Sequence, residues 1–72
     1  MPVETFVPKA SQNIAQVDYD AETQLLTVTF QDGRAYEYTS VPEAVFTGLK
    51  EAPSVGSYFH RQVKGVYAYT EV

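Results

Sequence analysis

The sequence predicts an α+β fold in which an antiparallel sheet packs against one main helix. Three observations carry this prediction. Two stretches alternate apolar and polar residues with period two, as half-buried strands do. An Asp32-Gly33 pair then gives a strong hairpin signal, and a later stretch spaces its apolar residues as a helix does. We expect a three-stranded antiparallel meander, a main helix, a second short helix, and a fourth C-terminal strand or extended edge.

Size and composition limit the kinds of protein that this chain can be. The 72 residues make one domain, and an apolar share of 44% with six tyrosines and four phenylalanines indicates a folded core. The chain has no cysteine, which excludes disulfides and fits a reducing compartment. It shows neither a signal peptide nor an apolar run long enough to span a bilayer. We therefore expect a soluble cytoplasmic protein without contact to membranes.

The first ten residues differ from the rest of the chain. They contain two prolines and no clear periodicity, so residues 1–10 are predicted to form a loosely ordered arm. Val3, Phe6 and Val7 are the side chains of this arm that can dock onto the sheet. Residues 11–72 are predicted to form the single domain.

The three predicted strands follow in order. The first has Ala15, Val17 and Tyr19 on its apolar face, and the second has Leu26, Val28 and Phe30. A two-residue loop at Asp32-Gly33 would place the next tyrosines on the threonine face. A three-residue loop with a left-handed Gly33 pairs Phe30 with Arg34 and Val28 with Tyr36, which keeps the apolar face continuous. We expect the three-residue loop.

Two helices are predicted after the hairpin. Ser40 and Glu43 fit a capping box, and Val41, Val45 and Leu49 follow at helical spacing until Pro53 ends the helix. A second, short helix is expected over residues 57–64, with Phe59 and Val63 on its apolar face and Gly65 as its stop. The residues from 66 to 70 are β-prone.

The sequence offers no defensible catalytic or metal site. Ser57, His60 and an aspartate can be combined into a triad on paper, but a single histidine makes such a match uninformative. One histidine with dispersed carboxylates also lacks the spacing of metal ligands. No glycine-rich phosphate loop is present. We expect no enzymatic activity, no cofactor and no bound metal.

Tyr36 and Tyr38 have two interpretations. They can be core side chains facing the main helix, or a platform on which RNA bases stack. The predicted register places both rings on the face of Val28 and Leu26. This favours the core.

The segment from residue 53 to residue 70 differs chemically from the rest of the chain. It has no acidic residue, yet it holds the only histidine, two of the five Lys/Arg and three of the six tyrosines. Its cations can form an ordinary solvated helix face, or a patch that binds anions among tyrosines. The candidate binding residues are Tyr58, His60, Arg61, Lys64 and Tyr67. The alternating Tyr67 and Tyr69 also admit pairing with a second copy or with a partner's sheet edge, beside ordinary pairing within the chain.

Several motifs together resemble the lysyl-tRNA synthetase C-terminal (KTSC) domain family. They are D-G-x-x-Y-x-Y-x-x-V-P, then A-x-S-x-G-x-Y-F, then a basic residue and a final Y-x-Y. Here they comprise Asp32-Gly33, Tyr36, Tyr38, Val41-Pro42, Ala52, Ser54, Gly56, Tyr58-Phe59, Lys64, Tyr67 and Tyr69. Ile14 and Tyr19-Asp20 look like the family's opening strand, so the match covers about residues 11 to 70.

The resemblance implies a small bacterial or phage protein, or a module of a larger enzyme. The family has no established biochemical function and defines no catalytic residue. RNA binding is implied only by its occurrence at the end of some lysyl-tRNA synthetases. Two departures weaken that implication: His60 stands where the family often has Asn, and the tail ends in Thr70-Glu71-Val72 where the family's is commonly basic.

The sequence thus leads to a non-enzymatic binding module that contacts RNA or a tRNA-associated enzyme through residues 57–69. The alternative is a protein-interaction module, either a modulator of a host or bacterial protein or a self-associating domain, with no nucleic-acid binding. The net charge of −4 favours that alternative because it repels phosphate at long range. A homodimer is one form that it can take.

Overall fold

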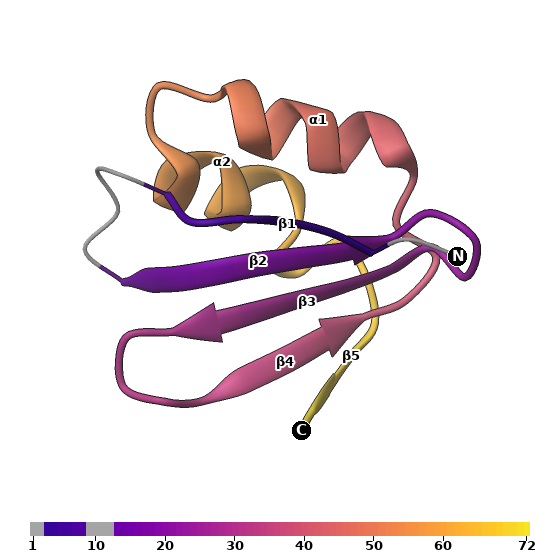
Figure 1. The fold of residues 1–72 in the computed structure, drawn as a ribbon, viewed down its shortest axis with the longest axis horizontal. Coiled ribbons are helices and arrows are strands. Elements are labelled where there is room, and N and C mark those ends of the chain that lie inside the picture. Colours follow the sequence, from indigo (N-terminus) through magenta and orange to yellow (C-terminus); the bar gives the residue numbers. More distant parts are fainter. Residues whose placement is uncertain (1–2, 9–12) are drawn as a thin grey trace.

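The computed structural model describes residues 3–8 and 13–72, which form a five-stranded sheet with two helices on one face (Figure 1). The strand order is β1-β2-β3-β4-β5, with every neighbouring pair antiparallel. Both helices lie between β4 and β5 in the chain. The elements are β1 Val3–Phe6, β2 Ile14–Asp20, β3 Leu25–Phe30, β4 Ala35–Tyr38, α1 Glu43–Glu51, α2 Val55–Gln62 and β5 Tyr69–Glu71. The predicted α+β class is confirmed, and the sheet has more strands than expected.

The additional strand is β1, which lies within the segment predicted to be a loosely ordered arm. Val3 pairs with Asp20 and Phe6 with Val17, so residues 3–6 form an edge of the sheet. The Phe6 ring packs against Phe46 of α1 with ring centroids 5.6 Å apart. The prediction of a loose arm is wrong for these residues, because pairing with β2 holds a segment whose own pattern is too short to indicate a strand. The rest of that prediction, at residues 1–2 and 9–10, lies outside the described residues.

A β-bulge changes which side chains of β2 enter the core. Ile14 pairs with Phe30 and Gln16 with Thr29, which leaves Ala15 as the extra residue. An extra residue reverses the alternation of side chains along a strand. Ile14 and Val17 are therefore both buried, and Ala15, expected on the apolar face, is only half-buried.

The hairpin between β3 and β4 has the predicted three-residue loop. The N–H of Phe30 donates to the carbonyl of Arg34 (2.8 Å), and Val28 pairs with Tyr36. Gly33 has φ +95°, the left-handed region that glycine enters without strain. The Asp32 carboxylate accepts from the N–H of Arg34 at 3.0 Å, which closes the loop. The expected register is confirmed.

The start of α1 differs from the predicted capping box. Pro42 is the N-cap and no side chain caps the helix, while Ser40 has φ +58°. The N–H of Val41 instead donates to the carbonyl of Gln24 (3.0 Å), which ties this segment to the β2–β3 turn. This hydrogen bond between residues distant in the sequence fixes the backbone before α1, where a capping box of Ser40 and Glu43 was expected. The apolar helix face is as expected, since Phe46 and Leu49 are buried.

The second helix begins and ends two residues earlier than predicted. Ser54 caps it, accepting from the N–H of Ser57 at 3.3 Å. Gly65, with φ +82°, follows in the turn after the helix. The core between helices and sheet consists of Ile14, Val17, Tyr19, Leu26, Val28, Tyr38, Val41, Phe46, Leu49, Phe59 and Val63. None of the described helices is long and apolar enough to span a membrane.

Candidate binding site

Two of the five predicted binding residues have structural roles. Tyr58 is half-buried and lies over Gly48 of α1, so closely that a Cβ at position 48 would collide with the tyrosine hydroxyl. The missing side chain of Gly48 therefore lets the two helices approach. Tyr67 is half-buried and packs against the core from the turn after α2. Both rings mainly hold α2 and its following turn in place.

The three predicted cations are exposed, but they do not form one patch. Arg61 lines an open groove of about 1100 Å³ between the helices, together with Tyr58. Lys64 lines a second pocket on the other side of α2. His60 lies between them and lines both. The predicted strip is thus divided between two faces, because α2 ends at Gln62 and Lys64 lies in the turn that follows. The helical spacing that would place Arg61 beside Lys64 therefore does not continue to Lys64.

The second pocket, of about 560 Å³, is lined by five aromatic rings and is called here the aromatic pocket. The rings are Phe30 of β3, Tyr36 and Tyr38 of β4, Phe59 of α2 and Tyr69 of β5. The polar residues that line it are Asn13, Gln31, Asp32, His60 and Lys64. It combines an apolar interior with a few polar groups, which is the usual character of a ligand site.

The rings of the aromatic pocket hold one another in place. Phe59 meets Phe30 and Tyr38 edge to face, with centroids 5.7 and 5.5 Å apart. Tyr69 contacts both Tyr36 (5.6 Å) and Tyr38 (5.5 Å). Such contacts each contribute about 0.5–1.5 kcal/mol beyond burial, so the rings form a preorganised wall. Tyr69 nevertheless keeps 60% of its surface exposed, which leaves a ring free to receive a ligand.

The strands explain why these rings meet. The hairpin register places Tyr36 and Tyr38 on the apolar face, and β5 pairs with β4 so that Tyr69 lies opposite Tyr38. Sequence reasoning assigned the first two tyrosines to the core. This is confirmed for the buried Tyr38 and for Tyr36, which is half-buried and packs against the core. Tyr69 lies within the predicted binding segment 57–69 and flanks the predicted patch, but it is not among the five candidate binding residues. The repeated Tyr-x-Tyr pattern at 36–38 and 67–69 is the signal that could have revealed it.

The electrostatics of the aromatic pocket combine both signs of charge. Burial raises the pKa of Tyr38, with smaller contributions from Tyr69 and Tyr36, so its hydroxyl stays protonated near neutral pH. A hydrogen bond with Tyr36 is the main reason that the pKa of Arg34 is raised, followed by the nearby charges of Asp32 and Glu71. The lining supplies Lys64 as a cation and Asp32 as an anion. Such a site can stack a planar ring and contact one anionic group.

Among residues 3–8 and 13–72 no cluster of three or more His, Asp or Glu could hold a metal ion. Of these residues, His60 is the single imidazole, and the aromatic pocket brings it beside Lys64 and aromatic rings. The aromatic pocket thus combines one imidazole, one ammonium group and one carboxylate with five aromatic rings.

Comparison with known families decides the identity of this fold. The model of the KTSC domain matches residues 10–67, which is most of the chain. The chain belongs to the KTSC domain family. The resemblance seen in the sequence motifs is confirmed.

Relatives of this KTSC domain include both large enzymes and small proteins. A lysine–tRNA ligase of Trichormus variabilis is 42% identical over 59 residues, covering 82% of this chain but only 10% of the ligase. The chain therefore spans about a tenth of the length of the ligases that it matches. An uncharacterised protein of Stutzerimonas stutzeri is 39% identical over 75% of this chain and 76% of its own length.

A solved structure supports the same assignment. The crystal structure of a KTSC domain protein from Yersinia pestis superposes with a TM-score of 0.88 at 25% identity, covering 99% of each chain. The five-stranded α+β architecture described above is thus that of a KTSC domain.

Proposed function

We propose that this KTSC domain is a non-enzymatic binding module that receives an unpaired base of single-stranded RNA in the aromatic pocket. The observation that carries the proposal is the exposed Tyr69 ring, held against Tyr36 and Tyr38 at the mouth of a preformed pocket. A base stacked on an aromatic side chain contributes about 1–3 kcal/mol, and any base can stack.

The charges next to the aromatic pocket support a phosphate contact. Lys64 and His60 line the pocket and are both exposed. A base stacked on Tyr69 would bring its backbone phosphate within reach of that side of α2. With so few cations and a net charge of −4, binding should be weak and limited to one or two nucleotides.

The family context supports the choice of RNA over other planar ligands. The matched region of the Trichormus variabilis protein is part of a lysine–tRNA ligase. A module attached to such an enzyme works beside tRNA, whose loops and 3′ end offer unpaired bases. The proposal therefore includes tRNA, free or held by its ligase, as partner, and it implies a cytoplasmic protein.

The test is a backbone amide NMR titration with a short single-stranded RNA and with bulk tRNA, at about 20 mM and then about 200 mM salt. We expect shifts at Tyr36, Tyr69 and Lys64 that fade at the higher salt. Lys64→Glu should abolish them. Arg61→Glu is the matched control: it makes the same change of charge on an exposed side chain of α2 that does not line the aromatic pocket.

The outcomes separate the possible sites. If the two charge reversals weaken RNA binding equally, long-range charge and not the aromatic pocket is responsible. An unchanged spectrum at low salt ends the RNA proposal. It then leaves the second candidate, a protein-interaction module, which the net charge and the free edge at β5 favour. Contacts to a protein partner through tyrosines should persist at about 200 mM salt.

A further inference from the structure

The outer edge of β5 carries backbone groups that no other described strand pairs. β5 ends the strand order, and Figure 1 shows it at the free edge of the sheet. The N–H of Val72 donates to Ala35 (2.9 Å), and the carbonyl of Ala68 accepts from Thr39 (3.0 Å). In an antiparallel ladder these bonds fall on alternate residues. The N–H and C=O groups of Tyr69 and Glu71 therefore point away from β4.

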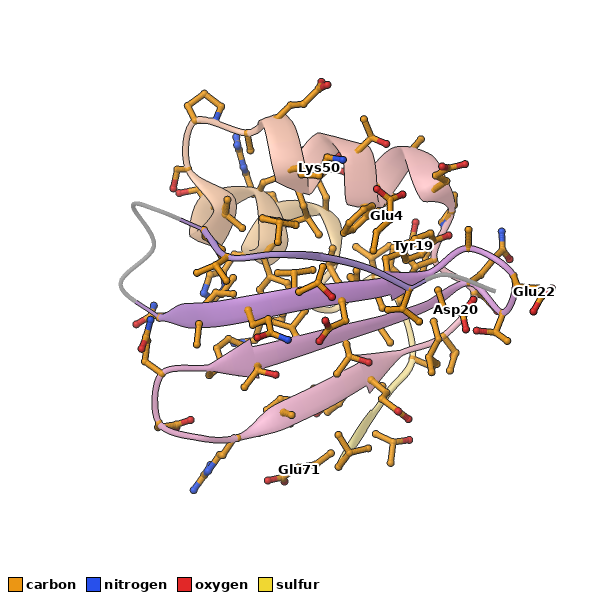
Figure 2. All side chains as sticks on the ribbon, viewed as in Figure 1. Glu4, Tyr19, Asp20, Glu22, Lys50 and Glu71 are labelled. Carbon is orange, nitrogen blue, oxygen red and sulfur yellow. The ribbon has the colours of Figure 1, made fainter. Side chains whose placement is uncertain are left out.

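This edge is less protected than the edge formed by β1. On β1, Glu4 forms an ion pair with Lys50 of α1 (3.5 Å), as Figure 2 shows, and Pro8 follows the strand. Charge and proline are the devices that keep sheet edges from pairing. Residues 69–71 contain no proline, and Glu71 is their one charged side chain. All three are exposed, and Tyr69 and Val72 keep 60% and 63% of their surface in solvent.

We propose that β5 pairs antiparallel with β5 of a second copy of this chain, with Thr70 on the two-fold axis. Three symmetric registers bring the outward-facing backbone groups of the two β5 strands together. In them the two-fold axis passes through residue 69, 70 or 71. Centring on 71 would place Glu71 opposite its own copy, which like charge disfavours. Centring on 69 would need residues 66 and 67 to be extended, but residue 66 is in the turn that follows α2. Centring on 70 uses the extended residues 68–72.

The charges on the sheet's open face suit this register. Thr5, Asp18, Thr27, Glu37 and Thr70 lie opposite one another in one row across the five strands. When Thr70 pairs with its copy, the row continues from Thr70 of one chain to Thr70 and then Glu37 of the second copy. In this row no two carboxylates come directly opposite each other, although each chain carries a net charge of −4. Facing threonines on adjacent strands are a favourable pair.

On the face of the sheet that carries the helices, and at the ends of β5, the side chains also fit this register. Glu71 would lie opposite Tyr69 of the copy, and Arg34 of its own chain is near enough to Glu71 for their charges to interact. The exposed Val72 would face Ala68 of the copy. Figure 2 shows Glu71 at the free edge, away from the helices. Because the axis is perpendicular to the sheet, both aromatic pockets would open on the same face of a ten-stranded sheet.

The interface is small. Five residues from each copy bury less than the roughly 1,200 Å² of a standard stable interface, so we expect a dissociation constant on the order of 100 µM. The dimer should form only in concentrated solution, or where a larger assembly brings two copies together.

The register is tested by cysteine cross-linking, because the chain has no cysteine of its own. Facing residues that do not exchange hydrogen bonds have Cα atoms about 4.5 Å apart, within the range of a disulfide. Thr70→Cys at about 200 µM should therefore oxidise to a covalent dimer. Glu71→Cys should not, since its copies lie diagonally across the axis. Ser57→Cys, an exposed position on α2, measures random collision. If Thr70→Cys cross-links no faster than Ser57→Cys, or more slowly than Glu71→Cys, the proposal is wrong.

Sedimentation equilibrium tests the association itself. The mass of the unaltered protein should rise toward that of a dimer between about 10 µM and 1 mM, the range that brackets the expected constant. Thr70→Lys should stay monomeric because two ammonium groups would meet at the axis. Within each chain the new lysine faces Glu37, so its circular dichroism should be unchanged. A monomeric mass for the unaltered protein at about 1 mM would overturn the proposal. Neither experiment contains RNA, so its result is independent of the proposed RNA contact.

Discussion

Two aromatic clusters at different places on the same sheet differ in how far their rings are buried. Tyr19 and Phe46 stack beneath α1 with ring centroids 5.0 Å apart, and each keeps only 1% of its surface exposed. The Tyr19 hydroxyl donates to the buried carbonyl of Val41 at 2.6 Å. The rings of the aromatic pocket contact one another at similar distances, but their burial differs: Tyr38 and Phe59 are buried, whereas Tyr69 is 60% exposed.

The difference teaches that residue type does not decide whether a tyrosine is structural or available for binding. The helices and strands that pack over the ring decide whether it is buried or exposed. α1 lies over the end of the sheet that contains Tyr19 (Figure 2), and β1 adds Phe6 to the same cluster. Beside β4 and β5, Phe59 of α2 provides a wall but leaves a pocket. The predictions below test this contrast, in order of their expected effect on the free energy of unfolding.

Phe46→Ala should have the largest effect. Removing a fully buried phenylalanine costs about 3–5 kcal/mol, which is a large part of the stability of a domain this small. Urea denaturation measures the loss. The matched variant is Phe30→Ala, which removes a half-buried ring next to the aromatic pocket and should cost clearly less. Equal losses would show that the two clusters are equally structural.

Tyr19→Phe should have an intermediate effect. It removes one hydroxyl and leaves the carbonyl of Val41 buried without that donor, which costs about 1–3 kcal/mol. Thermal unfolding of this variant is compared with that of Tyr36→Phe, whose hydroxyl serves the exposed Arg34 and should matter little. A larger loss for Tyr36→Phe would contradict the contrast.

Alkaline pH should destabilise the fold through the same buried tyrosines. Burial is the main cause that raises the pKa of Tyr19 and of Tyr38. Above about pH 10 the unfolded chain releases these protons before the folded chain does, so stability present below pH 10 is lost as pH rises. Urea denaturation between pH 8 and pH 11 should show this decline, and Tyr38→Phe should reduce its slope. An unchanged slope would mean that Tyr38 ionises as easily when folded.

Tyr69→Ala should have the smallest effect on stability and the largest on binding. Because the ring is largely exposed, its two contacts with Tyr36 and Tyr38 should together contribute only about 1 kcal/mol, the low end of the range for such pairs. RNA affinity, measured by fluorescence anisotropy, should fall about 5- to 150-fold with the loss of one stacking platform. Unchanged affinity would remove Tyr69 from the proposed site, and a large loss of stability would make it a core residue.

Local chemistry explains which parts of the fold could be predicted. The hairpin register follows from Asp32-Gly33 and the alternation beside it, since turn geometry and a buried face leave one consistent pairing. The predicted apolar face of α1 was also right, because apolar residues three and four apart lie on one side of a helix. The capping box was wrong because the backbone of Val41 bonds to Gln24, which holds Ser40 in a conformation that a helix cap does not use.

The candidate site could be predicted only in part. Lys64 and His60 were found because an acid-free segment is visible in the sequence, and the structure places both at the aromatic pocket. Arg61 and Tyr58 were grouped with them, but they line the other side of α2. Helix spacing alone does not show which side meets the sheet.

By itself, the sequence determined the α+β class, the hairpin, the helical faces and the motifs of the KTSC family, because each depends on residues close together in the chain. Only the tertiary structure decided that residues 3–6 form β1, that Ala15 is a bulge, and that Tyr69 meets Tyr38 at the open end of the sheet. These features depend on pairing between distant segments. Their energy comes from the assembled sheet, so the local patterns at these positions do not determine them.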